Sequence, residues 1–256
     1  MQPDPTESGA SVIELIPVLE DNYVIVWHNG REAVLVDPAV AEPVIHWLAQ
    51  RRLRPLAVLQ THHHADHIGG TPELLRRWPD LEVVAARADR ARIPFQTRGV
   101  ADGDRFSLLG RRLMVLEVPG HTRAHLAFHL QGEPERGLGD ELFCGDTLFL
   151  GGCGRLFEGS PAQMHGSLQR LAALPDDTRL WCAHEYTETN LRWAHAQRPQ
   201  DAAIQDRLER VARRRRNGEP TLPGCLAEER RTNLFLRAAD AEALALLRES
   251  RNHWRS

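Results

Sequence analysis

Short apolar runs separated by polar turn residues dominate the chain up to residue 182. They are rich in Val, Ile and Leu and lie at residues 12–16, 23–27, 33–36, 56–59, 82–85, 112–118, 126–130, 142–144 and 180–182. Runs of this length, bounded by Gly, Asn, Asp or Pro, are typical of buried β-strands. We therefore expect a strand at each of these positions.

Helical spacing of apolar residues lies between some of these strands and prevails from residue 185 onward. It predicts helices at residues 42–52, 72–78, 187–196, 201–217 and 239–249. Alternating strands and helices indicate a layered α/β fold, in which sites form where strands end. We expect a sheet-rich domain over residues 1–184 and a helical domain over residues 185–256.

Composition and charge narrow the class of protein. The net charge of −3 does not favour a surface that coats nucleic acid. No apolar run approaches the roughly 20 residues of a membrane span, and the N-terminus lacks the pattern of an export signal. The cysteines, at 144, 153, 182 and 225, form no CxxC pair. We expect a cytoplasmic protein with reduced thiols, without nucleic-acid or membrane partners.

One polar segment stands out against this pattern. Residues 61–70 read THHHADHIGG and directly follow the apolar run at residues 56–59. Clustered imidazole and carboxylate groups are costly to desolvate unless a cation binds them, and they suit zinc, iron or manganese. In an extended segment alternate side chains share a face, so His62 and His64 can point together while His63 points away.

Further metal-competent residues follow three later apolar runs. His121 lies in PGHT, Asp146 in CGDT and His184 in CAHE, and a glycine before His121 and before Asp146 permits a tight turn. These residues allow one group of His62, His64 and His121, and a second group of Asp66, His67 and His184. Asp146 could bridge the two groups. We expect the remaining histidines to be ordinary core or surface residues.

Such a ligand set predicts a binuclear metal site. Two divalent ions about 3.5–4 Å apart hold and deprotonate a shared water and polarise the bond under attack, which gives hydrolysis near neutral pH. Asp66 is then a ligand that can also relay a proton.

The motifs resemble those of a known family. The THHHADHIGG segment and the order of the later turns are similar to the metallo-β-lactamase superfamily, and the closest resemblance is to glyoxalase II, hydroxyacylglutathione hydrolase. The flanking segments that carry it are IPVLEDNY at 16–23, CGDTLF at 144–149, GCGRLFEG at 152–159, HEYT at 184–187 and TNLFLR at 232–237.

The resemblance implies a fold and an activity. The fold would be a four-layered αββα sandwich with a C-terminal helical domain that binds substrate. The activity would be cleavage of S-D-lactoylglutathione to glutathione and D-lactate, the second step of methylglyoxal detoxification. It would use two metal ions, zinc foremost and iron or manganese also acceptable, in a monomer.

The resemblance also implies a set of glutathione contacts, with departures. Tyr186 matches the family tyrosine, whereas Arg155 and Arg251 stand where the family usually has lysines, and Phe157 stands where many members have tyrosine. Arg248 matches the arginine of the terminal motif. A guanidinium can hold the glycine carboxylate of glutathione with two hydrogen bonds. The departures predict an altered affinity for glutathione.

Two alternatives compete with this interpretation. A related enzyme class, persulfide dioxygenase, has a similar motif but uses a single iron with two histidines and one carboxylate. A zinc-stabilised binding module would instead have closed sites of four ligands and no hydrolysis.

The run of four arginines at residues 213–216 could contact phosphate or an acidic partner. Four consecutive helical residues fan around the axis, however, so a solvated or salt-bridged helix is the favoured interpretation.

Overall fold

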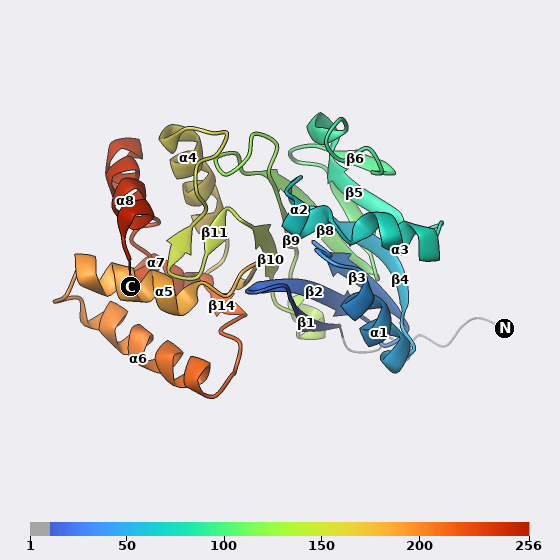
Figure 1. The fold of residues 1–256 in the computed structure, drawn as a ribbon, viewed down its shortest axis with the longest axis horizontal. Helices are drawn as coiled ribbons and strands as arrows, with labels where there is room; N and C mark the ends of the chain where they lie inside the picture. Colours follow the sequence, from blue (N-terminus) through green and yellow to red (C-terminus); the bar gives the residue numbers. More distant parts are fainter. Residues whose placement is uncertain (1–10, 256) are drawn as a thin grey trace.

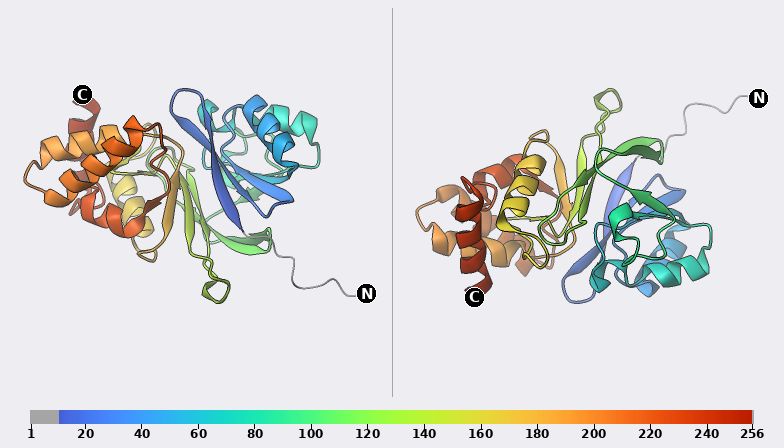
Figure 2. Two further views of the ribbon diagram at one scale, coloured as in Figure 1. Left: turned by 90° about the horizontal axis from the view of Figure 1, so that it is seen from below. Right: turned by 90° about the horizontal axis from the view of Figure 1, so that it is seen from above.

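The computed structural model describes residues 11–255 and contains two six-stranded mixed sheets that face each other (Figure 1, Figure 2). The first sheet has the order β1 (Val12–Val18), β2 (Asn22–His28), β3 (Glu32–Val36), β4 (Arg54–Leu59), β5 (Glu82–Ala86), β6 (Arg98–Val100). The second has the order β14 (Gly224–Cys225), β13 (Arg179–Cys182), β10 (Glu141–Gly145), β9 (Leu126–Leu130), β8 (Arg111–Glu117), β7 (Arg105–Leu108). A hairpin of β11 (Leu148–Phe149) and β12 (Gly152–Cys153) follows β10.

Helices cover the outer faces of both sheets. On the first sheet lie α1 (Glu42–Arg51) and α3 (Thr71–Arg77), whose Val44, Leu48 and Leu74 complete a core with the outward side chains of the strands. On the side of the second lie α4 (Pro161–Ala172), α5 (Thr187–Gln197), α6 (Ala202–Arg216), α7 (Leu226–Thr232) and α8 (Ala241–His253). Of these, α6 packs against α5 and α7, and α8 packs against α4. The order helix, sheet, sheet, helix is the expected four-layered αββα sandwich.

The C-terminal helices share one core with the second sheet. Trp193 of α5 and Phe235 after α7 are fully buried and stack with ring centroids 5.1 Å apart. Both belong to the same apolar cluster as Phe128 of β9 and Phe143 of β10. The helical region is therefore anchored by continuous apolar packing, not by a linker alone.

The apolar runs located most strands within two residues. Expectation and structure differ mainly at short elements: β6, β7, β14, the β11–β12 hairpin, α2 (Ala65–Ile68) and α7 were not expected. The longer helix α4 was not expected either. In α4 a signal was present, because the N-cap residue Ser160 and Gln163 of the first turn form a capping box.

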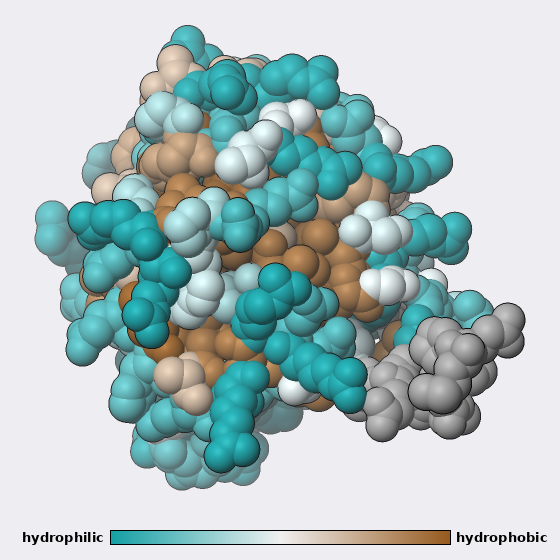
Figure 3. Space-filling model, turned by 90° about the vertical axis from the view of Figure 1, so that its right-hand side faces the viewer, coloured by the Kyte–Doolittle hydropathy of each residue, from teal (hydrophilic) through white to brown (hydrophobic). Residues whose placement is uncertain are grey.

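Apolar and hydrophilic side chains both lie on the surface of the protein. Figure 3 shows an apolar patch bordered by hydrophilic side chains on the side where the first sheet and its helices lie. Within residues 11–255 no helix is both long and apolar enough to cross a membrane.

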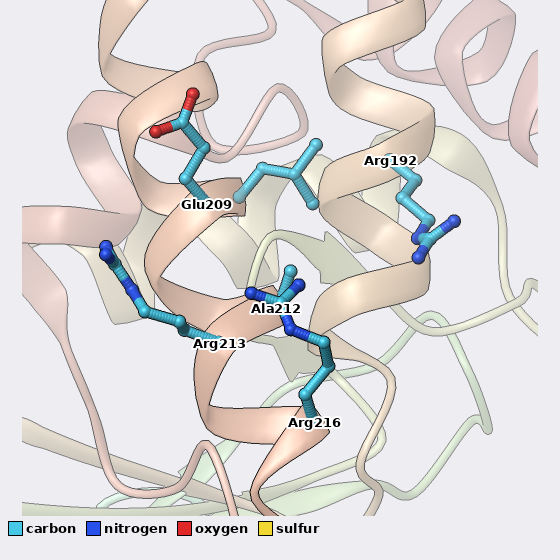
Figure 4. A pocket seen from close by; sticks show the side chains of 6 residues that line it. Arg192, Glu209, Ala212, Arg213 and Arg216 are labelled. Carbon is cyan, nitrogen blue, oxygen red and sulfur yellow. The ribbon is translucent and has the colours of Figure 1, made fainter.

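The four arginines at the end of α6 point in different directions. Arg215 pairs with Glu185, and Arg214 lies 3.9 Å from Glu219. Arg213 and Arg216 line a groove of about 430 Å³ with Arg192 of α5 (Figure 4). The run therefore does not form a single cationic face.

Candidate metal centre

The metal-competent residues converge at one edge of the sandwich. The first histidine segment follows β4, and α2 begins immediately after His64. His121 lies in the loop after β8, Asp146 in the turn after β10 and His184 directly after β13. Because the ends of these strands meet at the same edge, residues more than 100 positions apart become neighbours.

The first expected group is assembled. The Nε2 atoms of His62 and His121 each lie 3.0 Å from Nδ1 of His64. The three nitrogens face one another, so all three can bind the same cation.

The second expected group, Asp66, His67 and His184, is assembled beside the first. One Asp66 carboxylate oxygen lies 3.7 Å from Nε2 of His67 and 3.6 Å from Nε2 of His184. Asp66 is the most exposed member of this group, which leaves it in contact with solvent.

Asp146 lies between the two groups. Its Oδ1 is 3.4 Å from Nε2 of both His67 and His184, whereas its Oδ2 is 3.4 Å from Nε2 of His121. A carboxylate with one oxygen toward each group has the geometry of a bridge between two cations.

Four imidazoles are anchored through the nitrogen that faces away from the centre. Nδ1 of His67 contacts Asp37 at 2.9 Å and Nδ1 of His184 contacts Asp21 at 2.7 Å. Nδ1 of His121 contacts the Arg155 carbonyl at 2.9 Å, and Nδ1 of His62 contacts the Thr61 hydroxyl at 3.0 Å. With Nδ1–H donating, each Nε2 presents a lone pair to the centre, as a metal ligand requires.

Two buried atoms without partners also indicate that the donor set fits divalent cations. Nε2 of His67 and Oδ1 of Asp146 are buried and have no hydrogen-bond partner. Orphaned polar atoms at such depth are costly, and a shared cation would satisfy both.

Electrostatics favour the ligand form of some of these groups and the protonated form of others. Burial and the neighbouring imidazoles lower the pKa of His64 to about 4, and burial also holds the pKa of His62 well below its usual value. Burial alone would raise the pKa of Asp146, but His67 and His184 outweigh it and hold that pKa well below its usual range. Burial lowers the pKa of His67 and of His184, but Asp146 outweighs it and raises the pKa of both imidazoles. His62 and His64 are therefore neutral beside an ionised Asp146, whereas a cation would take the place of the proton that His67 and His184 favour.

The turn that presents Asp146 depends on Gly145. This residue has φ of +48°, and a Cβ there would lie 2.4 Å from the hydroxyl of Thr61. Only glycine combines this conformation with so close an approach.

Sequence reasoning missed the residues that support the candidate ligands. Asp37 accepts hydrogen bonds from the backbone and hydroxyl of Thr61 as well as from His67. His125 is a buried core histidine, as expected, but its ring stacks on His62 and its Nε2 accepts the N–H of Asp146 at 3.1 Å. His63 points away from the centre toward Asp89 and Glu158.

A cavity of about 1000 Å³ opens above the centre and contains all of the expected glutathione contacts. Its lining includes Arg155, Tyr186, Arg248 and Arg251 as well as Phe157. Among the described residues, no carboxylate pairs with any of these three arginines, so their charge is available to an anionic ligand.

The arginines are not equivalent. Arg248 is buried, and its Nη1 donates to the carbonyl of Cys153 at 2.7 Å. Arg251 shares one acceptor, Oδ1 of Asn190, between Nε and Nη2 at 3.3 and 3.2 Å. Arg248 therefore has a buried contact with the backbone that sequence reasoning did not predict, whereas the hydrogen bonds of Arg251 go to a side chain.

The β11–β12 hairpin connects Asp146 to this cavity, and α7 holds it in place. Glu229 accepts the N–H of Gly151 at 2.8 Å, and the Asn233 amide donates to the carbonyl of Gly152 at 2.9 Å. Arg207 of α6 neutralises Glu229 in the same buried network.

Two family models match the chain. The model of the metallo-beta-lactamase superfamily matches residues 16–184, and the model of the hydroxyacylglutathione hydrolase C-terminus matches residues 185–254.

Curated relatives match over nearly the full length. The hydroxyacylglutathione hydrolase of Parasynechococcus marenigrum (strain WH8102) is 61% identical over 246 residues, covering 96% of this chain and 99% of the relative. That of Synechococcus sp. (strain CC9902) is 58% identical over 248 residues, covering 96% and 99%.

Solved structures of similar fold include ETHE1 from Myxococcus xanthus, with a TM-score of 0.67 and 26% identity over 95% of this chain and 92% of that one. TTHA1623 in a di-iron-bound form has a TM-score of 0.59 and 27% identity over 88% and 99%.

Proposed function

Since the chain belongs to the hydroxyacylglutathione hydrolase family, glyoxalase II, of the metallo-β-lactamase superfamily, we propose that it hydrolyses S-2-hydroxyacylglutathiones. S-D-lactoylglutathione is the foremost substrate, and the products are glutathione and D-lactate. The reaction is the second step of methylglyoxal detoxification.

One observation carries this proposal: two groups of metal-competent side chains share Asp146 at the floor of a cavity that also holds arginines without carboxylate partners. The first feature suits attack on a carbonyl carbon, and the second suits a substrate with remote carboxylates. A glutathione thioester combines both.

We assign His62, His64 and His121 to one cation and Asp66, His67 and His184 to the other, with Asp146 between them. Divalent cations bound there would supply Lewis acidity and lower the pKa of water. The imidazoles are held in the required tautomer by Asp37, Asp21, Thr61 and the Arg155 carbonyl. Asp66, which reaches solvent, can carry the proton that the attacking water loses.

The cavity residues orient the substrate. Arg155, Arg248 and Arg251 would bind the carboxylates of glutathione, and Tyr186 would contact its backbone. A thiolate leaves with a pKa of about 8.5, so the reaction needs no general acid at the sulfur.

The metal, compartment and assembly are part of the proposal. Zinc suits the nitrogen-rich donors, and iron or manganese would also be accepted. The four free cysteines fit a reducing compartment, the cytoplasm. We propose that the enzyme acts as a monomer.

The test is hydrolysis of S-D-lactoylglutathione by metal-replete protein, with His64→Ala and His46→Ala as variants. His46 is exposed on α1 and away from the cavity, so it is the matched control. We expect activity in the wild type and in His46→Ala, and its loss in His64→Ala. No activity in the wild type would exclude the proposal.

Metal analysis separates this function from the single-iron alternative. The two complete groups predict about two metal equivalents per chain. One equivalent of iron, with oxygen consumption in the presence of glutathione persulfide, would favour a persulfide dioxygenase.

A further inference from the structure

A cluster of charged side chains beside the metal centre links the two halves of the sandwich. Arg92 follows the short helix η1 (Arg87–Asp89), which comes after β5 of the first sheet, and it pairs with both Asp89 and Glu158. Glu158 lies between β12 and α4, in the second half, and lines the cavity. The Arg92–Glu158 pair therefore joins the two halves at the part of the cavity wall to which Glu158 belongs.

Both carboxylate oxygens of Glu158 are engaged. Oε1 accepts from Nη1 of Arg92, and Oε2 accepts from the backbone N–H of Arg123 at 2.9 Å. The side chains of Arg92 and Glu158 are 29% and 21% exposed, so their interaction is partly shielded from water. Shielding makes the pair stronger than a fully exposed one.

This pair holds the segment that contributes to the cavity wall. Residues 154–159 include Arg155 and Phe157, and the N–H groups of Phe157 and Glu158 make long 3.3 Å bonds to the carbonyl of His121. The Phe157 ring packs edge-on against His64 and His121 but remains 62% exposed. Leu156 packs partly buried against the apolar core, and the Glu158 side chain is the charged anchor of the same segment.

The middle histidine of the THHHADH motif belongs to the same cluster. Nε2 of His63 lies 3.2 Å from Nη1 of Arg92, and its Nδ1 lies 3.5 Å from the buried Oδ2 of Asp89. The alternation that directs His62 and His64 to the metal centre directs His63 to this pair.

We infer that Arg92 and Glu158 are positioning residues for the substrate, whose ion pair fixes residues 154–159 so that Arg155 and Phe157 meet the glutathione part. This inference rests on the proposed function. Neither residue is a candidate metal ligand, and neither needs to contact the reacting carbonyl.

Such residues affect binding more than chemistry. A contact remote from the reacting bond stabilises the ground and transition states alike, so its loss raises KM and leaves kcat nearly unchanged. Loss of a metal ligand would instead lower kcat.

The experiment compares the metal-replete wild type with Glu158→Gln, Arg92→Gln and the double variant. Glu32→Gln is the matched control. Glu32 and Arg54 also form an ion pair, but they are the first residues of β3 and β4, whereas the metal-competent residues follow the last residue of β4. The measurements are KM and kcat for S-D-lactoylglutathione, the Kd of glutathione by calorimetry, metal content and Tm.

We expect each single variant to raise KM and the glutathione Kd about fivefold, with kcat within about twofold and metal content unchanged. The double variant should be no worse than the worse single variant, because both substitutions break one interaction. Arg92→Lys keeps the positive charge, so it should recover part of the affinity for glutathione. If a Gln variant unfolds, the Kd of glutathione for Arg92→Lys tests the positioning role instead.

Unchanged KM and Kd in an active enzyme, or independent multiplicative effects of the two substitutions, would overturn the positioning role alone. A wild type that neither hydrolyses the thioester nor binds glutathione would overturn the proposed function as well.

Discussion

The phenol ring of Tyr186 stacks on the imidazole of His184, with centroids 4.8 Å apart and planes within 5° of parallel. Phe149 packs edge-on against both rings. The stack holds one face of the His184 ring, while Asp21, which also lines the cavity, holds its Nδ1. Tyr186 therefore lies where the metal centre and the substrate cavity meet.

This stack predicts different outcomes for two substitutions of Tyr186. Tyr186→Phe keeps the ring and removes only the hydroxyl, so KM should rise about threefold to tenfold, the loss of one hydrogen bond, with Tm unchanged. Tyr186→Ala also removes the stacking, which contributes about 0.5–1.5 kcal/mol, so Tm should fall as well. Steady-state kinetics and thermal unfolding check both. Equal Tm values for the two variants would contradict a stabilising stack.

Asp37→Asn should weaken metal binding without disturbing the backbone. Asp37 has φ of 48°, a conformation that asparagine also tolerates, but an amide NH2 at Oδ2 would face two donors, the Thr61 hydroxyl and Nδ1 of His67. Loss of such support typically costs 10–100-fold in metal affinity. Competition with a chromogenic chelator measures this, and an unchanged affinity would argue against the anchoring role.

Arg251→Ala and Arg248→Ala should separate substrate binding from structure. Both should raise KM more than they lower kcat, because a remote carboxylate contact serves ground and transition states alike. Only Arg248→Ala should also lower Tm, by removing the buried bond to the Cys153 carbonyl. A selective loss of kcat with KM intact would contradict the assignment of either arginine.

Alkylation of the folded protein near neutral pH should label Cys225 alone. Burial raises the pKa of Cys153 to about 11 and that of Cys182 to about 12, and it holds the pKa of Cys144 well above its usual value. The folded state favours the neutral thiols, so their neutral form contributes to the free energy of unfolding. This contribution is complete below the unfolded pKa of about 8.5, and it declines as the pH rises toward 11. Mass spectrometry after iodoacetamide treatment, and unfolding at stepped pH, test both statements. Rapid labelling of Cys153 at pH 7 would contradict them.

Gly154→Ala should disrupt the metal centre. A Cβ at this position would lie 1.9 Å from the carbonyl oxygen of Asp146 and 3.1 Å from Nδ1 of His121, so the backbone that presents both side chains must move. We expect fewer than two metal equivalents and loss of hydrolysis. The control is Gly166→Ala in α4, where nothing lies within 4 Å and stability should rise by about 1 kcal/mol. Full metal content in Gly154→Ala would contradict this prediction, because it would show that the backbone around residue 154 can shift without loss of the metal centre.

Periodicity predicted the long elements because their buried faces repeat over several residues. The buried strands β4, β9 and β10 and the amphipathic helix α6 gave clear patterns. The four-residue helix α2 could not be predicted in this way, since it is shorter than two turns and two of its four residues are candidate ligands. Two-residue strands such as β11 and β12 likewise depend on tertiary contacts.

The residues proposed to bind metal were recognisable because their types and spacing are unusual. Asp37 was not, because its contacts with Thr61 and His67 arise only when β3 and β4 pair in parallel and their ends meet. The Arg92–Glu158 pair joins residues 66 positions apart. Neither interaction leaves a local pattern in the chain.

The hold of α7 on the β11–β12 hairpin has a consequence for redesign. The proposed metal ligands all precede residue 185, whereas Arg248 and Arg251 lie on α8, so a new final helix alone would change two of the proposed substrate contacts. Glu229 and Asn233, however, tether the hairpin that runs between Asp146 and the cavity. A chimaera in which the C-terminal helices are exchanged to change the preferred thioester must therefore exchange α7 and α8 together.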